Sequence, residues 1–487
     1  MKRTMLAVLC AFALLLPIVP LAADETGYPG LYRYKLDNGL ELYVYRDNSL
    51  PIARVEICFR AGAMAQTPDT AGLFHLYEHL VFGGDASNGG SAGVKAALAT
   101  IGAAEWNGGT SAERVDYWLT LPSSKVTEGL RFWADRLRPA DFSPADLEAA
   151  KSVVGAEVKA YEATPEAIYQ AAMDKRLFAK YPWRRDPAGT DAAIKAATPE
   201  AMAAIRDGWF VPNNAAVIVG GDVDPEAVRA AVASAFAGWK PGPDPWERPN
   251  PSHPRPGVVR PTWMVYPDTS LPEGVALVEM RYRAPDLGAD PKASYAADLW
   301  TALVADPAGR FKAAVMKGVP RLYGVDPVSA YYVSQREGGT LSISAYFSVD
   351  PSLPAASRAQ VFKETARGIE ITTMRSSSSY FGAADYEAAR DRLEAARRLS
   401  LETASDLVSS LAWWWAEASG DYFIGYDGAL AKTGPAEVNA FIDTYILRNL
   451  EVIALRMNPA DYERERKSLS AAGFVTVNQT NAYWWQK

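Results

Sequence analysis

The chain has 487 residues, a formal net charge of -7, 49% hydrophobic residues and 22% charged residues. This length provides for two to four ordinary domains with sizeable buried cores, and the composition is that of a globular protein rather than a disordered one. The acidic charge, without a basic stripe that could contact phosphates, excludes a nucleic-acid partner.

The first residues have the pattern of a secretion signal. Lys2 and Arg3 give a positive start, residues 5–22 form an apolar run, and small residues follow at its end. Prolines interrupt the run, which favours removal of residues 1–23 over their retention as a membrane anchor. No later stretch is long and apolar enough to span a bilayer. We therefore expect a periplasmic or secreted protein whose mature form has no membrane span.

The cysteines do not predict a disulfide. The chain has two, and because Cys10 lies inside the signal, the mature chain retains only Cys58. Cys58 stands in an alternating run that is typical of a strand. We expect it to be a small core residue rather than a nucleophile.

A proline-dense stretch divides the sequence. Residues 239–263 read WKPGPDPWERPNPSHPRPGVVRPTW, which can form neither a helix nor a central strand. This composition suits a semi-rigid linker. We therefore expect a first domain over residues 24–238 and a second over residues 264–487. His253 falls in the linker, where a solvated histidine is favoured over a metal ligand.

The two halves resemble each other. Residues 55–61, VEICFRA, are echoed by residues 278–284, VEMRYRA. A second echo lies near the end of each half, where Asp207, Trp209 and Asn214 correspond to Asp443, Tyr445 and Asn449. Two echoes in the same order, at similar offsets, indicate a duplicated domain.

Strands and helices are expected in groups within the first half. Residues 34–45 predict a hairpin around an Asn-Gly turn, and residues 55–59 predict a further strand. Helices are expected at residues 71–82, 126–137 and 144–162. The last of them has Ser143 as its cap and Pro144 in its first turn. This grouping favours the α+β class.

The most informative segment is residues 72–84, GLFHLYEHLVFGG. On a helix, His75, Glu78 and His79 lie at positions i, i+3 and i+4, so all three project from one face. Two neutral imidazoles at this spacing can bind one zinc ion and leave positions for another protein ligand and a water. Glu78 would stand beside that water, take a proton from it, and later deliver the proton to the leaving amine.

A polar helix face without a metal is the alternative interpretation of these three residues. The chain has only three histidines, and two of them match the inverted zinc motif His-x-x-Glu-His, which favours the metal site. A third ligand is still needed, preferably a carboxylate. The residues alone leave Glu148, Glu157 and Glu162 as candidates.

With these motifs the sequence resembles the insulinase/pitrilysin family of metallopeptidases, which includes the mitochondrial processing peptidases. The resemblance covers most of residues 34–238. Besides the zinc motif it includes Asn-Gly-Gly-Thr at 107–110, Tyr-Pro-Trp at 181–183 and Phe-Val-Pro-Asn-Asn at 210–214. It implies a zinc-dependent endopeptidase with two homologous α+β domains, each a mixed, largely antiparallel sheet with helices packed on it.

The resemblance also assigns residues to the site. The family's spacing selects Glu157 as the third ligand. Asn107 and Gly108 match an edge strand beside the zinc, where an extended peptide substrate would add as a further strand. The alternative for Asn107 is a turn residue before two glycines, and those glycines would make a flexible edge.

Three features depart from the family pattern: Ala150, the Gly108-Gly109 pair where the family tends to have a tight glycine-alanine-like sequence, and the second half. Ala150 stands where family members often carry another glutamate, so one supporting carboxylate is missing. In the second half, residues 298–302 replace the zinc helix and hold no metal. Tyr323 can occupy the position of a tyrosine that binds the substrate carbonyl, but Met316 falls where an arginine is expected.

The missing arginine suggests a partner. Arg310 or Arg321 could substitute only from a different direction, and losing one such donor typically costs about two to three decades in rate. Some family members work as pairs in which one chain carries the zinc and the other the arginine and tyrosine. We therefore expect a homologous subunit or a homodimer. The alternatives are a non-catalytic subunit that retains zinc and a peptide-binding or assembly module.

Overall fold

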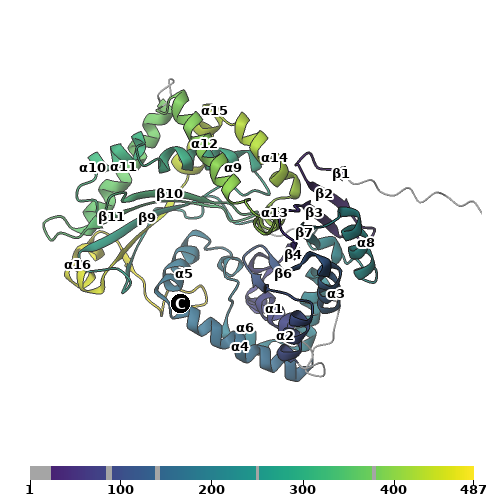
Figure 1. Cartoon of the computed structure of the whole chain (residues 1–487). Helices are drawn as coiled ribbons and strands as arrows, with labels where there is room; N and C mark the ends of the chain where they lie inside the picture. Colours follow the sequence, from purple (N-terminus) through teal and green to yellow (C-terminus); the bar gives the residue numbers. More distant parts are fainter. Residues whose placement is uncertain (1–23, 84–89, 138–142, 248–251, 376–379, 487) are drawn as a thin grey trace, which may run out of the picture.

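The computed structural model describes residues 24–83, 90–137, 143–247, 252–375 and 380–486. Two sheets with helices packed against them form its two halves (Figure 1). The expected signal, residues 1–23, lies outside the described residues. Within the described ranges, no helix combines the length and the apolar character needed to cross a membrane.

The first half is built on a seven-stranded sheet with the order β1-β2-β3-β7-β4-β6-β5. Strands β3 and β7 pair in parallel, and the other neighbours pair antiparallel. The strands are β1 (Asp24–Glu25), β2 (Leu31–Lys35), β3 (Glu41–Arg46), β4 (Ile52–Phe59), β5 (Glu105–Thr110), β6 (Val115–Pro122) and β7 (Ala215–Gly221). The helices are α1 (Leu73–Gly83), α2 (Gly90–Thr100), α3 (Val126–Leu137), α4 (Pro144–Glu162), α5 (Pro165–Leu177), α6 (Asp191–Ala196), α7 (Pro199–Trp209) and α8 (Pro225–Ala235).

The second half is built on a six-stranded sheet with the order β10-β11-β9-β12-β8-β13. Strand β8 pairs in parallel with β12 and β13, and the other neighbours pair antiparallel. The strands are β8 (Thr262–Pro267), β9 (Val275–Arg283), β10 (Val328–Val333), β11 (Thr340–Ser348), β12 (Glu451–Met457) and β13 (Val475–Thr476). The helices are α9 (Pro291–Ala305), α10 (Arg310–Gly318), α11 (Ala355–Arg375), α12 (Ala383–Leu399), α13 (Ala404–Glu417), α14 (Gly420–Lys432), α15 (Pro435–Phe441) and α16 (Pro459–Ala471).

The two halves repeat one topology, which confirms the expected duplication and the α+β class. The order β3-β7-β4-β6-β5 in the first sheet corresponds strand for strand to β8-β12-β9-β11-β10 in the second. The helices α1 to α8 correspond in chain order to α9 to α16. The sequence echo at residues 55–61 and 278–284 falls on β4 and β9, which are inner strands of the two sheets.

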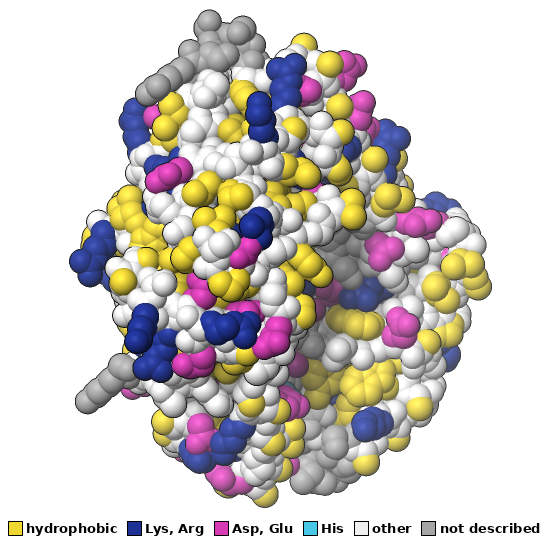
Figure 2. All heavy atoms as spheres, turned by 90° about the vertical axis from the view of Figure 1, so that its left-hand side faces the viewer, with side chains coloured by type: hydrophobic (Ala, Val, Ile, Leu, Met, Phe, Trp, Pro, Cys, Tyr) yellow, Lys and Arg dark blue, Asp and Glu magenta, His cyan; other side chains and the backbone are white. Residues whose placement is uncertain are grey.

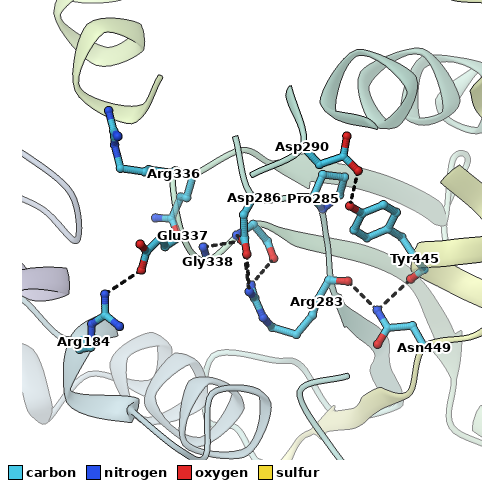
Figure 3. Close-up of polar contacts among 12 residues, drawn as sticks. Arg184, Arg283, Pro285, Asp286, Asp290, Arg336, Glu337, Gly338, Tyr445 and Asn449 are labelled. Carbon is cyan, nitrogen blue, oxygen red and sulfur yellow. Dashed lines mark hydrogen bonds and ion pairs between the residues drawn. The ribbon is translucent and has the colours of Figure 1, made fainter. Parts of the chain in front are cut away.

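The second sequence echo marks one repeated hydrogen-bond pattern. In each half, an asparagine side-chain amide donates to two main-chain carbonyls. One carbonyl lies at the end of β4 or β9, and the other lies in the helical segment just before the asparagine. These bonds run from Asn214 to Arg60 and Trp209 in the first half, at 3.0 and 2.9 Å. In the second half they run from Asn449 to Arg283 and Tyr445, at 2.6 and 3.0 Å (Figure 3). The second sequence echo therefore reflects the same hydrogen-bonded arrangement in both halves.

Local signals explain why the elements begin where they do. The expected hairpin forms between β2 and β3, and Gly39 supplies the positive φ of 86° that its turn requires. The expected helix at 144–162 forms as α4, and the Ser143 side chain accepts the Asp146 N–H at 3.1 Å. The same combination of a capping side chain and a following proline begins α5, α7, α8, α9 and α16.

One helix of each half packs against the sheet of the other half. Helix α5 packs on β9 and β12 of the second sheet, and its counterpart α13 packs on β4 and β7 of the first. The Tyr169 hydroxyl of α5 donates to Glu279 of β9 at 2.7 Å. Cys58 of β4, fully buried as expected, lies against Ala412 of α13. Each sheet therefore has part of one face covered by the opposite half.

The hairpin turns of the two halves also meet. Glu113, in the turn between β5 and β6, accepts the main-chain N–H groups of Arg336 at 2.6 Å and Glu337 at 2.8 Å. These two residues lie in the equivalent turn between β10 and β11. Arg184 of the first half adds an ion pair to Glu337 at 2.8 Å (Figure 3). The junction is therefore fixed by charged groups from both halves.

The expectation that His253 is solvated is wrong. The residue is 4% exposed, and its ring packs against Phe178 and Tyr181 with ring centroids 4.8 and 6.0 Å away. The proline-dense segment lies against the end of α5, so close that a Cβ on Gly257 would stand 2.3 Å from the Leu177 carbonyl oxygen. The composition of this segment does not reveal its long-range packing.

A buried carboxyl in the second half predicts a pH effect on stability. Burial raises the pKa of Glu370, on α11, to about 8. The folded state therefore binds the proton of Glu370 more tightly than the unfolded state does. The contribution of Glu370 to the free energy of unfolding is fully present below about pH 4.5 and is lost as pH rises through about 8. Replacing Glu370 with Gln should raise the melting temperature by roughly 3 °C or more at about pH 8.5 and leave it unchanged near pH 5.

Thermal unfolding at the two pH values checks this expectation, with the exposed Glu364→Gln on the same helix as a control. The same shift at both pH values would show that ionisation of Glu370 is not the cause.

Candidate metal centre

Helix α1 presents its polar residues on one face because its apolar residues occupy the rest. Leu73, Phe74, Leu76, Tyr77, Leu80 and Val81 are buried in the first core. The start of the helix is fixed by Gly72, whose φ of 93° and close approach to the Ala188 carbonyl leave no room for a side chain. His75, Glu78 and His79 remain on the face that α4 approaches.

The structure brings Glu157 to the two histidines. The Nε2 atoms of His75 and His79 are 3.2 Å apart, and Glu157 Oε2 lies 3.8 and 3.2 Å from them. Among the described residues, these three side chains form the one group of acidic, histidine or cysteine residues close enough to share a metal ion. Of the three candidate glutamates, Glu157 is the one that lies beside the histidines, whereas Glu148 forms an ion pair with Lys151.

The spacing of the donor atoms fits zinc. Two donors bound to one tetrahedral zinc at about 2.0–2.2 Å lie roughly 3.3–3.5 Å apart, which is close to the distances found here. Burial, followed by the neighbouring His79, lowers the pKa of His75 to about 4, and burial also lowers the pKa of His79. Both rings are therefore neutral at physiological pH, which is the form that binds a metal.

Glu78 has the properties of a proton-transfer group. It is 8% exposed, and its Oε2 accepts a hydrogen bond from the Thr110 hydroxyl at 2.8 Å. Burial raises the pKa of Glu78 to about 7, and the charges of Asp116 and Glu157 act in the same direction. A carboxyl with a pKa near the working pH can both accept and return a proton. The sequence motif identifies Glu78 but gives no indication of its bond to Thr110.

The structure places Asn107 and Gly108 in β5, at the edge of the first sheet. Asn107 is exposed and pairs with Trp118 of β6, so the turn alternative for Asn107 is wrong. A glycine is required at position 108, because a Cβ there would lie 2.4 Å from the Phe82 ring. The glycine lets α1 approach the edge strand closely, so flexibility does not by itself explain its presence.

Ala150 lies on the side of α4 that faces α1 and is 9% exposed. Together with His79, Phe82, Trp106 and Val153 it lines a cavity of about 420 Å³. The place of the missing family carboxylate is therefore mainly apolar. Glu157 is the acidic residue of α4 that reaches the histidines.

Among the described residues of the second half, no arginine forms a hydrogen bond or ion pair with these ligands. Met316, on α10, and Tyr323, in the loop after it, are about half exposed. Arg310 donates to the Tyr380 carbonyl at 3.0 Å, and Arg321 forms an ion pair with Asp350. Both arginines are thus engaged within the second half. The main-chain N–H of Tyr323 donates to the Tyr346 carbonyl, and no hydrogen bond in the described structure joins Tyr323 to the three ligands.

Comparison with known families identifies both halves. Residues 43–191 match the family described as Insulinase (Peptidase family M16), and residues 196–374 match Peptidase M16 inactive domain. Together the matches span more than half of the chain. The second match begins near the end of the first half and includes residues 298–302, which replace the zinc motif.

Curated relatives of this chain are named as zinc proteases. YmxG of Bacillus subtilis is 21% identical over 197 residues, which are 40% of this chain and 48% of that protein. PqqL of Escherichia coli is 24% identical over 229 residues, which are 45% of this chain and 24% of that protein. The chain thus spans about half the length, or less, of the curated relatives it matches. Zinc is the metal of this family.

Solved structures share the fold. A protease from Helicobacter pylori superimposes with a TM-score of 0.71 at 16% identity, over 88% of this chain and 99% of that chain. The first half of the periplasmic protease PqqL from E. coli gives 0.72 at 17% identity, over 93% and 97%. The whole PqqL chain gives 0.69 at 16% identity, over 93% of this chain but 50% of that one.

The converging donors predict metal binding at one ion per chain. Replacing Glu157 with Gln removes the carboxylate ligand, and the loss of affinity should exceed the 10- to 100-fold that is typical for outer partners of a ligand. Zinc content after dialysis and competition with a chelator measures this. The matched control is Glu148→Gln on the same helix, which should retain its zinc. Equal zinc content in the two variants would contradict the assignment.

Proposed function

The chain belongs to the insulinase family, peptidase family M16, and we propose that it is a zinc-dependent endopeptidase acting on peptides bound in an extended conformation. The observation that carries this proposal is the convergence of His75, His79 and Glu157 beside the buried carboxyl of Glu78. The names of the zinc protease relatives support it.

Each residue has a distinct role in this mechanism. His75, His79 and Glu157 would hold the zinc, which when bound supplies a Lewis acid that polarises the substrate carbonyl and acidifies water. Glu78 takes the proton of the attacking water and then delivers it to the leaving amine. Burial favours this double role, since it keeps the pKa of Glu78 near 7.

Substrate binding is proposed at the edge strand β5. Asn107 and Gly108 lie in this strand, and its unpaired edge is where the main chain of an extended peptide can add to the sheet. The face on the left of Figure 1 is hollowed, and hydrophobic side chains gather along the recess (Figure 2). We place the peptide between the two halves, with Tyr323 as a donor to its carbonyl.

A homologous partner is part of the proposal. Met316 stands where an arginine is expected, and the nearby Arg310 and Arg321 are held by contacts within their own half. The whole PqqL chain is about twice the length that this chain matches. We therefore propose that the chain is the zinc-bearing member of a pair, either with a homologous subunit or with a second copy, in the periplasm or outside the cell.

A non-catalytic role is the second candidate. Ala150 in place of a glutamate and Met316 in place of an arginine both favour a subunit that retains zinc but serves in peptide binding or assembly. The two candidates differ in the role of Glu78, which only an enzyme requires.

Replacing Glu78 with Gln separates these candidates. The variant keeps the shape of the side chain but cannot accept a proton, so peptide cleavage should fall by at least about two decades. Zinc content and peptide binding should stay unchanged. Cleavage of a mixed peptide library, with and without a chelator, measures the effect. Cleavage by the variant at the wild-type rate would remove Glu78 from the mechanism.

The pairing proposal predicts low activity for the isolated chain. An added homologous subunit that carries the arginine should raise kcat/KM by about two to three decades, because it restores the missing donor to the substrate carbonyl. Titrating such a subunit into the purified chain while measuring cleavage tests this. Full activity of the monomeric chain alone would exclude an obligatory partner.

A further inference from the structure

The carboxylate of Glu78 is held by a side chain from outside its own helix. Thr110 Oγ1 donates to Glu78 Oε2 at 2.8 Å, and it is the hydrogen bond found for this carboxylate within the described residues. Thr110 is the last residue of β5, the strand to which the substrate is proposed to add. One residue therefore contacts the proposed base and also ends the proposed substrate strand.

The main chain around Thr110 is anchored from three directions. Thr110 pairs with Val115 of β6. In the turn that follows, the Ser111 and Ala112 carbonyls accept the N–H groups of Ala63 and Met64 at 3.1 and 2.7 Å. The third anchor is the Glu113 carboxylate, which is bound by the main chain of the second half. The hydroxyl is consequently presented from a rigid point.

We propose that Thr110 is a positioning residue that fixes one carboxylate oxygen of Glu78 and so leaves the other directed at the attacking water. This inference rests on the proposed function, but it concerns the orientation of Glu78 rather than the presence of the metal. A carboxylate can rotate about its last side-chain bond, and a misplacement of about 1 Å can cost about a hundredfold in rate. The hydroxyl restricts that rotation.

A purely structural role for Thr110 makes different predictions. If the hydroxyl only satisfied a buried carboxylate, its removal would lower the melting temperature or the zinc content, and the turnover of the chains that keep zinc would not change. A positioning role instead lowers kcat in chains that are folded and loaded with zinc, with little change in KM.

Three variants, assayed with saturating zinc and with the partner if one is required, test the proposal. Thr110→Val keeps the shape and removes the hydroxyl, and it should lower kcat per zinc-loaded chain by about 10- to 100-fold with KM within about twofold of wild type. Thr110→Ser keeps a hydroxyl and should recover kcat to within about threefold. Thr120→Val, on the neighbouring strand β6, is the matched control and should leave kcat unchanged.

A second measurement does not depend on activity. In crystal structures of the zinc-free proteins, the Glu78 side chain should occupy a single rotamer in wild type and in Thr110→Ser, and more than one in Thr110→Val. An unchanged kcat in Thr110→Val, an equal loss in Thr110→Ser, or a single Glu78 rotamer in all three proteins would overturn the proposal. A wild-type chain that cleaves no peptide would instead defeat the proposed function, and the rotamer measurement would still decide the role of Thr110.

Discussion

The contact between α1 and α4 is the constraint on which the site depends. Helix α1 buries its apolar face in the first core, and α4 buries Leu147, Ala150, Val154 and Val158 along one stripe. Two helices that pack through small and branched side chains come close enough for polar residues at the border of the contact to converge. His75, His79 and Glu157 are those border residues. The proposed metal donors are therefore positioned by hydrophobic packing, and the polar contacts among them are its result.

The same burial sets the charge state of the site. Desolvation keeps both imidazoles neutral and raises the pKa of Glu78 to about 7, close to physiological pH. Glu157, by contrast, has a side chain that is 52% exposed, so its carboxylate stays in contact with solvent. A divalent cation would then meet two neutral ligands and one anionic ligand. One helix turn thus provides both uncharged ligands and a proton carrier.

The sequence predicts those parts of the molecule that depend on local signals. The Asn-Gly hairpin, the capped start of α4 and the shared face of His75, Glu78 and His79 all follow from residues a few positions apart. The proposed third ligand depends on a contact between distant segments, and only the resemblance to a family selected Glu157 in advance. The burial of His253, the bond from Thr110 to Glu78 and the packing of α5 and α13 on the opposite sheets are also long-range. No pattern along the chain marks them.

The packing of α5 and α13 on the opposite sheets bears on how a two-fold repeat of this kind can exist. Part of the face of each sheet is covered by a helix of the other half. If the chain were cut at the proline-dense segment, each separate repeat would expose apolar surface that it cannot cover by itself. Two separate copies of one repeat could make the same contacts only as a dimer in which a helix of each copy packs on the sheet of the other. The continuous chain is, in this sense, a dimer whose subunits have been joined end to end.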